Sequence, residues 1–482
     1  MSNSGCCEAV VVGSGPNGLA AALVLARRGA RVLVLEADET IGGGARSAEL
    51  TRPGFVHDVG SAVHPLAVGS PFFSNLPLEE YGLHWIHPEV PLAHPLEEAP
   101  AAVLHRSVER TAAELGGLDD SAYRTLMEPL VRRWEELAED LLGPILRVPS
   151  FPLLMARFAR RAIRSAESLS RGWFEGRRAR ALFAGLAAHA ALPLNAWGSS
   201  AFGLVLGSAG HAVGWPFPQG GAQRLADALA AHLRALDGEV ITGRRIDRLE
   251  ELPECRAVLL DVTPRQLLHI AGDRLPAGRY RRRLEGWRYG PAVFKVDYAL
   301  SEPIPWSDPA CRRAGTVHVG GSLEEIARAE QTVAEGEPPD HPFVLLAQHS
   351  RFDPTRAPEG KHTAWAYCHV PLGAGSDMSR RIERQIERFA PGFRDCILER
   401  HTSAPADLQR MNPNLIEGDI YGGSQDLPQL LARPVLRLTP YRTPLPRHYL
   451  CSASTPPGGG VHGMCGYHAA RVALRDGSLS RP

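Results

Sequence analysis

Lysine is almost absent from this 482-residue chain: it occurs only at Lys295 and Lys361, and arginine supplies nearly all of the positive charge. Arginine stays protonated, whereas lysine can be tuned to act as a nucleophile, so a lysine nucleophile has few candidates here. Net charge is also lacking, because 53 Lys and Arg balance 53 Asp and Glu. This balance gives no reason to expect nucleic acid as a partner.

Paired cysteines and long apolar runs are missing as well. The eight cysteines form no CxxC pair and no Cys/His spacing typical of a metal site, so we predict neither a redox-active disulfide nor a bound metal. No segment of about twenty residues is continuously apolar, and no signal peptide is recognisable at the start. These absences predict a cytoplasmic protein with reduced thiols.

What the chain does have is a dinucleotide-binding pattern near its start. The apolar run Ala9–Val12 leads into the loop Gly13-Ser14-Gly15-Pro16-Asn17-Gly18, which opens a helical segment. A second apolar strand, Arg31–Leu35, follows the helix and ends at Glu36. Strand, glycine loop, helix, strand and acid in this order predict a site for an ADP moiety.

Each residue of the pattern has a physical role in such a site. Gly13 allows the tight turn, Gly15 lets a pyrophosphate approach the backbone, and Gly18 lets helix and strand pack closely. The helix N-terminus offers unpaired N–H groups to the phosphates. The carboxylate of Glu36 accepts hydrogen bonds from the ribose and would repel a 2′-phosphate, which disfavours NADP.

A second glycine cluster, Gly42-Gly43-Gly44-Ala45-Arg46-Ser47, follows soon after the acid. It lets the backbone pass close to the same dinucleotide, although an ordinary glycine-rich turn is the alternative. The order of loop, acid and second cluster resembles the flavoprotein superfamily of amine oxidases and phytoene desaturases. Amine oxidases usually carry arginine where Gly44 stands, so Arg46 is the nearby cation left to face a pyrophosphate.

A third glycine-rich segment, Gly458–Gly463, lies between a predicted strand and the last predicted helix. Its spacing matches GxGxxG, but the chain ends before an acid could follow, so we do not predict a second dinucleotide site. Instead, we expect the helix N-terminus to point at an isoalloxazine ring, where it would stabilise the charge of reduced flavin.

Over its whole length the chain resembles the phytoene desaturase-like flavoproteins, and most closely their branch named for pyridine nucleotide-disulphide oxidoreductase domain-containing protein 2. The segments that carry this resemblance are DPTRAPEGKH (353–362), PADLQRMNPN (405–414), Gly418–Gly423 and YLCSASTPPGGGVHGMCGYHAA (449–470). The resemblance implies non-covalent FAD, a hydrophobic substrate and an α/β fold. In that fold, a Rossmann-like FAD-binding domain (1–75, 214–275 and 445–482) is interleaved with an α+β substrate domain (76–213 and 276–444).

The pattern and the resemblance together give the residues predicted to hold FAD. In that family Gly60-Ser61 would pass beside the flavin and Ile246 would lie near its adenine end. The full set is Gly13, Ser14, Gly15, Pro16, Asn17, Gly18, Glu36, Ala37, Gly43, Gly44, Arg46, Gly60, Ser61, Ile246, Ser452, Ala453, Gly460, Val461 and Met464.

We expect an FAD-dependent oxidoreductase that desaturates, saturates or isomerises a carbon–carbon bond of an apolar, polyene or isoprenoid substrate. Histidine titrates near neutrality, so His462, His64 and His369 are the acid/base candidates, with a structural, hydrogen-bonded histidine as the alternative for each. Two other functions stay open: an amine or porphyrinogen oxidase, and a lipid-binding protein similar in fold to Rab GDP-dissociation inhibitors.

The segment Arg147–Phe174 mixes arginines with large apolar residues, a composition typical of a basic amphipathic helix on an anionic membrane surface. A solvated arginine face on a packed helix is the alternative. The stretch Ala181–Gln223 then contains no Asp, Glu, Lys or Arg, which predicts deep burial or an apolar channel. Together these segments indicate peripheral membrane contact as a hypothesis.

Overall fold

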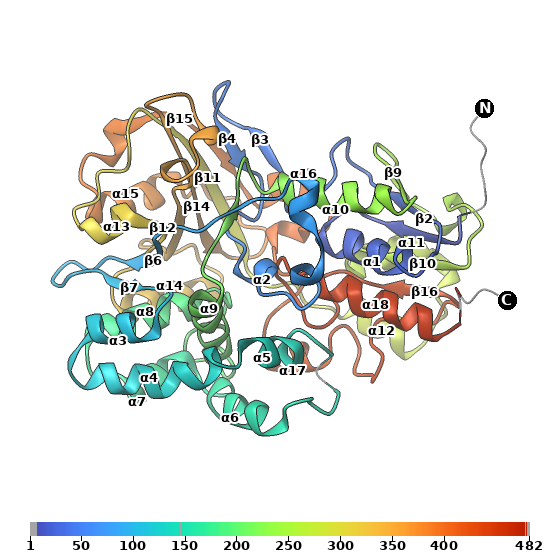
Figure 1. Cartoon of the computed structure of the whole chain (residues 1–482), viewed down its shortest axis with the longest axis horizontal. Helices are drawn as coiled ribbons and strands as arrows, with labels where there is room; N and C mark the ends of the chain where they lie inside the picture. Colours follow the sequence, from blue (N-terminus) through green and yellow to red (C-terminus); the bar gives the residue numbers. More distant parts are fainter. Residues whose placement is uncertain (1–6, 145, 478, 480–482) are drawn as a thin grey trace.

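The computed structural model describes residues 7–144, 146–477 and 479. Two sheets lie next to each other along the long axis of the molecule, with helices packed around both (Figure 1). A parallel sheet of the Rossmann type beside a mixed sheet confirms the predicted α/β fold class.

The first sheet is parallel throughout, with the strand order β16-β10-β1-β2-β9. Its central strands are almost entirely apolar, as expected for parallel strands covered on both faces. One face packs on α1, α10 and α18, and the other on α11 and α12. The strands are β1 (Ala9–Val12), β2 (Val32–Leu35), β9 (Glu239–Ile241), β10 (Ala257–Leu260) and β16 (His448–Leu450). The helices are α1 (Pro16–Ala26), α10 (Gln223–Ala235), α11 (Pro264–Ala271), α12 (Arg279–Glu285) and α18 (Met464–Arg475).

The strands of this sheet come from three separate stretches of chain, residues 9–35, 239–260 and 448–450. The first and last parts of the sequence therefore meet in one sheet. The domain boundaries themselves stay a prediction, and residues 1–6, 478 and 480–482 of the first predicted domain lie outside the described residues.

The second sheet is mixed, with the order β15-β11-β14-β13-β12-β6-β7. β11 and β14 pair antiparallel over nine residues each, and only the contact of β12 with β6 is parallel within the described sheet. Its strands are β6 (Val90–His94), β7 (Ala102–Leu104), β11 (Ala292–Leu300), β12 (Ala314–Val319), β13 (Val344–Ala347), β14 (His362–Val370) and β15 (Ile397–Ser403). One face packs on α13 (Pro309–Arg313) and α15 (Ser379–Phe389).

The other face of this sheet packs on a group of helices, at the lower left of Figure 1. The neutral stretch 181–223 forms most of α8 and all of α9 in this layer. Most residues of both helices within this stretch are buried. The helices are α3 (Val108–Leu115), α4 (Gly117–Val131), α5 (Trp134–Leu141), α6 (Pro152–Ala162), α7 (Ala166–Trp173), α8 (Arg177–Ala188), α9 (Ser200–Ala212) and α14 (Leu323–Ala334).

Shorter elements connect the two sheets. The strands are β3 (Ser47–Glu49), β4 (Val56–Asp58), β5 (Trp85–Ile86) and β8 (Phe217–Pro218), and the helices are α2 (Pro65–Val68), α16 (Pro405–Met411) and α17 (Leu427–Leu431). Single 3-10 turns lie at Phe73–Asn75, Leu78–Tyr81, Leu249–Glu251, Gly272–Arg274, His349–Arg351, Pro354–Arg356, Phe393–Cys396 and Ile416–Gly418.

The structure corrects one local expectation about the arginine-rich segment. Arg147–Phe174 is not one amphipathic helix but two, α6 and α7. The break occurs because the Ser165 hydroxyl accepts a hydrogen bond from the Ser168 N–H and starts a new helix. The basic and apolar residues of this segment therefore lie mainly on α6 and the loop before it.

Candidate functional site

β1 passes into α1 through the predicted glycine turn. Gly13 has a φ of +100°, a region that favours glycine. A Cβ on Gly18 would lie 2.0 Å from the Gly13 carbonyl oxygen, so Gly18 has the packing role predicted for it. At the start of α1, Pro16 has no N–H and the Gly18 N–H donates to Asp261, so the N–H of Asn17 is the one left for an anion among the described residues.

Glu36 lies beside this turn at the end of β2. Its carboxylate accepts hydrogen bonds from the Ser14 N–H at 2.8 Å, the Ser14 hydroxyl at 2.5 Å and the Asp38 N–H at 3.0 Å. An ionised carboxylate has about four lone-pair sites, so it can still accept from ribose hydroxyls. The Glu36 carboxylate is therefore held in a position to accept hydrogen bonds from the ribose of a bound adenosine.

The second glycine cluster lies against the first. A Cβ on Gly43 would lie 3.2 Å from the Cα of Gly15. Arg46 follows, and its guanidinium is fixed by the Asp38 carboxylate at 2.6 Å and by the Met411 carbonyl at 2.7 Å. The cation predicted to face a pyrophosphate is thus rigidly placed, and Asp38 offsets part of its charge.

The C-terminal glycine turn positions His462. The Met464 N–H donates to Nδ1 of His462 at 3.0 Å, and because an N–H can only donate, the proton of the neutral ring is on Nε2. That Nε2 atom is buried and has no hydrogen-bond partner among the described residues. Burial lowers the pKa of His462 to about 4, against the opposing effect of the Gly458 and Gly459 carbonyls. His462 is therefore a neutral hydrogen-bond donor near pH 7.

Asp261 is a site residue that the sequence pattern did not lead us to predict. It follows β10, and its Oδ2 accepts a hydrogen bond from the Gly18 N–H at 2.9 Å. Burial raises its pKa to about 7, with Glu36 adding to the shift and the Gly18 hydrogen bond opposing it. The signal was present in the sequence: an acidic residue directly after a buried strand of the dinucleotide-binding sheet.

A cavity of about 960 Å³ joins these features to the substrate side of the molecule. It extends from Glu36 past Gly15 and His462 to the region between the two sheets. There its wall is mainly apolar, with Met155, Phe158, Ile163, Phe202, Val205, Leu206 and Trp215. Several of these residues come from the charge-free stretch 181–223, so this stretch supplies both buried core and cavity wall.

Most of the predicted site residues border this cavity. They are Gly13, Gly15, Pro16, Asn17, Glu36, Ala37, Gly43, Gly44, Arg46, Gly60, Ser61, Ile246, Ser452, Ala453, Gly460, Val461, His64 and His462. Segments from the beginning, middle and end of the chain therefore meet at one site.

Four predicted residues do not border the cavity. Ser14 instead binds Glu36, and Gly18 packs against Gly13. Met464 is buried in the core between α1 and α18. His369 lies behind the cavity wall, where it contacts Tyr367 and Tyr421, which both border the cavity.

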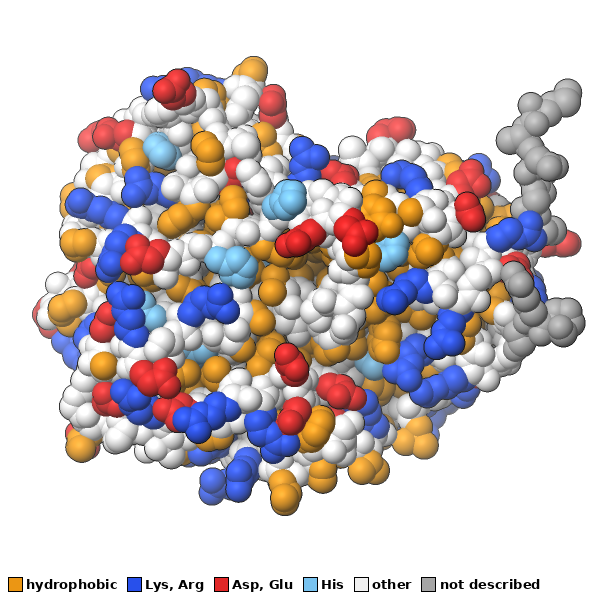
Figure 2. Space-filling view, viewed as in Figure 1, with side chains coloured by type: hydrophobic (Ala, Val, Ile, Leu, Met, Phe, Trp, Pro, Cys, Tyr) orange, Lys and Arg blue, Asp and Glu red, His pale blue; other side chains and the backbone are white. Residues whose placement is uncertain are grey.

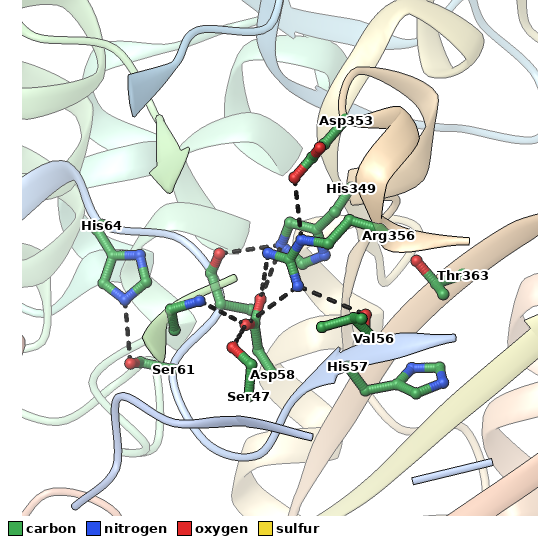
Figure 3. Close-up of polar contacts among 12 residues, drawn as sticks. Ser47, Val56, His57, Asp58, Ser61, His64, His349, Asp353, Arg356 and Thr363 are labelled. Carbon is green, nitrogen blue, oxygen red and sulfur yellow. Dashed lines mark hydrogen bonds and ion pairs between the residues drawn. The ribbon is translucent and has the colours of Figure 1, made fainter. Parts of the chain in front are cut away.

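A buried ion-pair network braces the wall near Gly60 and Ser61 (Figure 3). Arg356, from the DPTRAPEGKH segment, donates to Asp58 at 2.9 and 3.2 Å and to Asp353 at 3.2 Å, and all three side chains are fully buried. Although burial alone would raise it, Arg356 and His349 hold the pKa of Asp58 well below its usual range. His349 lies 2.9 Å from the Ala62 carbonyl, so the network fixes the strand-to-α2 segment.

His64 belongs to the same segment (Figure 3) and also borders the cavity. Its Nε2 lies 3.1 Å from the Ser61 hydroxyl. Burial lowers the pKa of His64 to about 4. Like His462, it is neutral near pH 7, which does not suit a group that must gain a proton at that pH.

His369 is part of a buried chain of polar groups that ends at the cavity. Its Nδ1 lies 3.0 Å from both carboxylate oxygens of Glu330, and its Nε2 lies 3.4 Å from the Tyr421 hydroxyl. The Tyr421 hydroxyl also hydrogen-bonds to that of Tyr367, and both tyrosines border the cavity. An ionised carboxylate can only accept, so Nδ1 of His369 carries a proton and donates it to Glu330.

Lys295 is the second residue whose position the sequence pattern did not predict. This rare lysine is buried, borders the cavity, and forms an ion pair with Asp297. Burial raises the pKa of Asp297 to about 6, although Lys295 opposes the shift. The signal available in the sequence was a lone lysine in an apolar strand.

The residues present fit a dinucleotide. Three glycine-containing segments give a ligand access to backbone, and Glu36 and Arg46 lie at one end. Several buried polar atoms beside the cavity, among them Oδ1 of Asn17 and Nε2 of His462, have no partner among the described residues. Such orphaned atoms are expected to be satisfied by a ligand.

Comparisons with known proteins agree with this geometry. Residues 11–74 match the family described as an NAD(P)-binding Rossmann-like domain. Pyridine nucleotide-disulfide oxidoreductase domain-containing protein 2 of Rattus norvegicus is 26% identical, over 97% of this chain and 93% of that protein. One of the subunits of limonene dehydrogenase from Castellaniella defragrans is 23% identical, over 98% of this chain and 95% of that protein.

A solved structure of putrescine oxidase with bound putrescine has the same fold, with a TM-score of 0.62, 18% identity and 98% coverage of both chains. The resemblance stated from the sequence and the predicted fold are confirmed. Together with the site geometry, these findings identify the chain as a relative of Rossmann-type oxidoreductases, similar along nearly its whole length to pyridine nucleotide-disulfide oxidoreductase domain-containing protein 2.

Proposed function

We propose that this protein is an FAD-dependent oxidoreductase that desaturates, saturates or isomerises a carbon–carbon bond of a hydrophobic, polyene or isoprenoid substrate. The observation that carries the proposal is the continuity of the cavity. The same cavity borders the glycine cradle at one end and an apolar wall at the other. A cofactor and an apolar substrate in this cavity would therefore be in contact.

The contribution of the C-terminal turn to the cradle supports FAD, the cofactor that the family resemblance implies, over a nicotinamide dinucleotide. Gly15, Glu36 and Gly43 would hold the ADP half, and Gly460 and Val461 from the C-terminal turn would border the flavin half. FAD in this place would supply two-electron redox chemistry. The Nε2–H of His462 would be a fixed donor beside it.

The chain's own residues would exclude water and hold a proton in place. The apolar wall keeps water from the reacting bond. The Tyr421 hydroxyl, backed by His369 and Glu330, would keep its proton and act as a hydrogen-bonding group at the cavity surface, because burial raises the pKa of Tyr421 well above its usual range. His369, expected from the sequence to act directly as an acid/base group, would therefore act indirectly by orienting the Tyr421 hydroxyl.

An apolar substrate is favoured over an amine by the charges along the wall. The carboxylates that border the cavity lie mainly at the Glu36 end, and Asp140 already accepts from Arg147 and two backbone N–H groups. Asp297 near the substrate side is engaged in its ion pair with Lys295. Limonene, named in one relative, is an uncharged hydrocarbon, which agrees with such a wall, whereas putrescine is a diamine.

The test is to purify the full chain and record its visible spectrum, with extraction and identification of bound small molecules. We expect a flavin spectrum, FAD on extraction, and an unsaturated apolar compound as ligand. Turnover of amines would instead support the amine oxidase function. Protein without flavin but with bound lipid would support the binding function similar to Rab GDP-dissociation inhibitors.

A further inference from the structure

Exposed apolar side chains are concentrated on one face of the molecule. Eight of the eleven exposed large apolar residues in the described chain come from residues 146–163, Trp197 and residues 431–438. The most exposed are Val148 (88%), Leu153 (78%), Leu438 (78%) and Trp197 (70%). Figure 2 shows apolar and basic side chains mixed along the lower edge of the molecule, where α6 lies in Figure 1.

These three segments adjoin in space. The Gly198 N–H donates to the Ile163 carbonyl at 2.9 Å, which places Trp197 beside the end of α6. A Cβ on Gly198 would lie 3.8 Å from the Cβ of Leu427 in α17. Leu146 and Leu431 border one small cleft. We call this surface the arginine–apolar face and define it by residues 146–163, 197 and 431–438.

The arginine–apolar face is cationic as well as apolar. Residues 144–164 and 427–447 contain no Asp or Glu, whereas the first of these ranges contains five arginines. Arg157 and Arg160 are exposed on α6 and form no ion pair with any described residue. The neighbouring α5 carries exposed Glu135 and Glu139, so the acidic residues next to the face lie on a different helix.

The cavity reaches the surface at the same face. Ile163 and Leu431 are both exposed and both border the cavity, as do Pro149, Ala159 and Gly198. A ligand that enters or leaves here passes between the exposed apolar side chains. An opening surrounded by apolar residues and unpaired arginines is unusual for a face that only contacts water.

We propose that the arginine–apolar face docks on an anionic lipid bilayer and that the substrate enters the cavity from the lipid. Apolar side chains such as Leu153 and Trp197 would enter the interfacial region, and Arg157 and Arg160 would contact lipid phosphates. Charge complementarity selects an anionic bilayer over a neutral one. The entry route rests on the proposed function, whereas the docking itself does not.

The experiment is co-sedimentation of the full chain with phosphatidylcholine vesicles that contain or lack phosphatidylserine. We expect wild-type protein to sediment with the anionic vesicles and to be released by salt. Arg157→Ala with Arg160→Ala should weaken this binding roughly ten-fold or more, since each arginine near the surface contributes to attraction. Leu153→Ser with Trp197→Ser should weaken binding even at low salt.

Matched controls come from α15, which packs on the other face of the mixed sheet from α6. Arg380→Ala with Arg384→Ala removes two exposed arginines of α15, and Leu372→Ser removes an exposed apolar residue near it. Both should bind vesicles as wild type does. Circular dichroism and flavin absorbance of each variant show that it is folded and report the proposed function separately from docking.

Three outcomes would overturn the proposal. One is that wild-type protein does not sediment with anionic vesicles at low salt. Another is that the α15 control loses binding as strongly as the α6 variant. The third is self-association through Leu153 and Trp197, detected by light scattering and without vesicle binding, which would assign the face to a second copy of the chain.

Discussion

The carboxylate of Glu36 accepts two hydrogen bonds from Ser14, one from the backbone N–H at 2.8 Å and one from the hydroxyl at 2.5 Å. This pair ties the glycine turn after β1 to the end of β2. The acid is therefore oriented by the loop that would hold the phosphates of the same ligand.

Glu36→Ala should reduce FAD affinity roughly ten-fold or more, because a hydrogen bond to a charged acceptor contributes about 1.5–3 kcal/mol. The measurement is fluorescence titration of flavin-free protein with FAD. Glu39→Ala is the control, since Glu39 is exposed nearby and does not border the cavity. If Glu36→Ala and Glu39→Ala bind FAD with equal affinity, Glu36 does not contact the cofactor.

Asp261→Asn should stabilise the protein in a pH-dependent way. The pKa of Asp261 is raised from 3.8 to about 7 in the folded state, so folding favours its protonated form. The folded state then loses stability as the pH rises from about 4 to about 7, and the penalty is complete above that window. The amide keeps an acceptor for the Gly18 N–H and carries no charge.

We therefore expect the variant to melt a few degrees higher than wild type at alkaline pH and at the same temperature near about pH 4. Thermal unfolding over a pH series measures this. Asp273→Asn, at an exposed residue in the turn after α11, should show no such trend. A gain of Asp261→Asn that does not vary with pH would contradict the explanation.

Arg356→Ala should cost about 3–5 kcal/mol in the free energy of unfolding, because it leaves Asp58 and Asp353 buried without their cation. Urea unfolding measures the loss. Arg52→Ala removes an exposed ion pair with Glu399 and should cost at most about 1 kcal/mol.

The same residue predicts a pH dependence. The depressed pKa of Asp58 contributes stability that is present above its unfolded value of about 4 and is lost as the pH falls below it. The difference between wild type and Arg356→Ala should thus shrink in acid. A constant difference would mean that Arg356 acts by packing alone.

Glu330 and His369 should behave as a coupled pair. Glu330→Ala and His369→Ala each remove one partner of a buried hydrogen bond, and the double variant should lose less stability than the sum of the two single variants by at least about 0.5 kcal/mol. A double-mutant cycle of urea unfolding measures the coupling. Tyr421→Phe should change the free energy of unfolding by no more than about 1.5 kcal/mol. If the effects of the two single variants simply add in the double variant, Glu330 and His369 are not coupled.

Many elements of this fold can be predicted from short stretches of the sequence. β1 has the predicted bounds Ala9–Val12, and β2 (Val32–Leu35) begins one residue later than predicted, because apolar runs and glycine turns are properties of neighbouring residues. The glycine turn, Glu36 and the C-terminal turn were also predicted from short patterns. The break between α6 and α7 was missed, although Ser165 is a recognisable helix cap.

Sequence alone thus determined that the chain has a dinucleotide cradle and which residues form its turns, since those roles follow from backbone conformation and spacing. Only the tertiary structure decided which distant residues lie next to this cradle and its cavity. Asp261 accepts a hydrogen bond from Gly18, which is 243 positions away in the sequence. Tyr421 links His369 to the cavity, and Trp197 lies beside α6 at the cavity opening. Contacts of this kind depend on how distant elements pack, and no local periodicity encodes them.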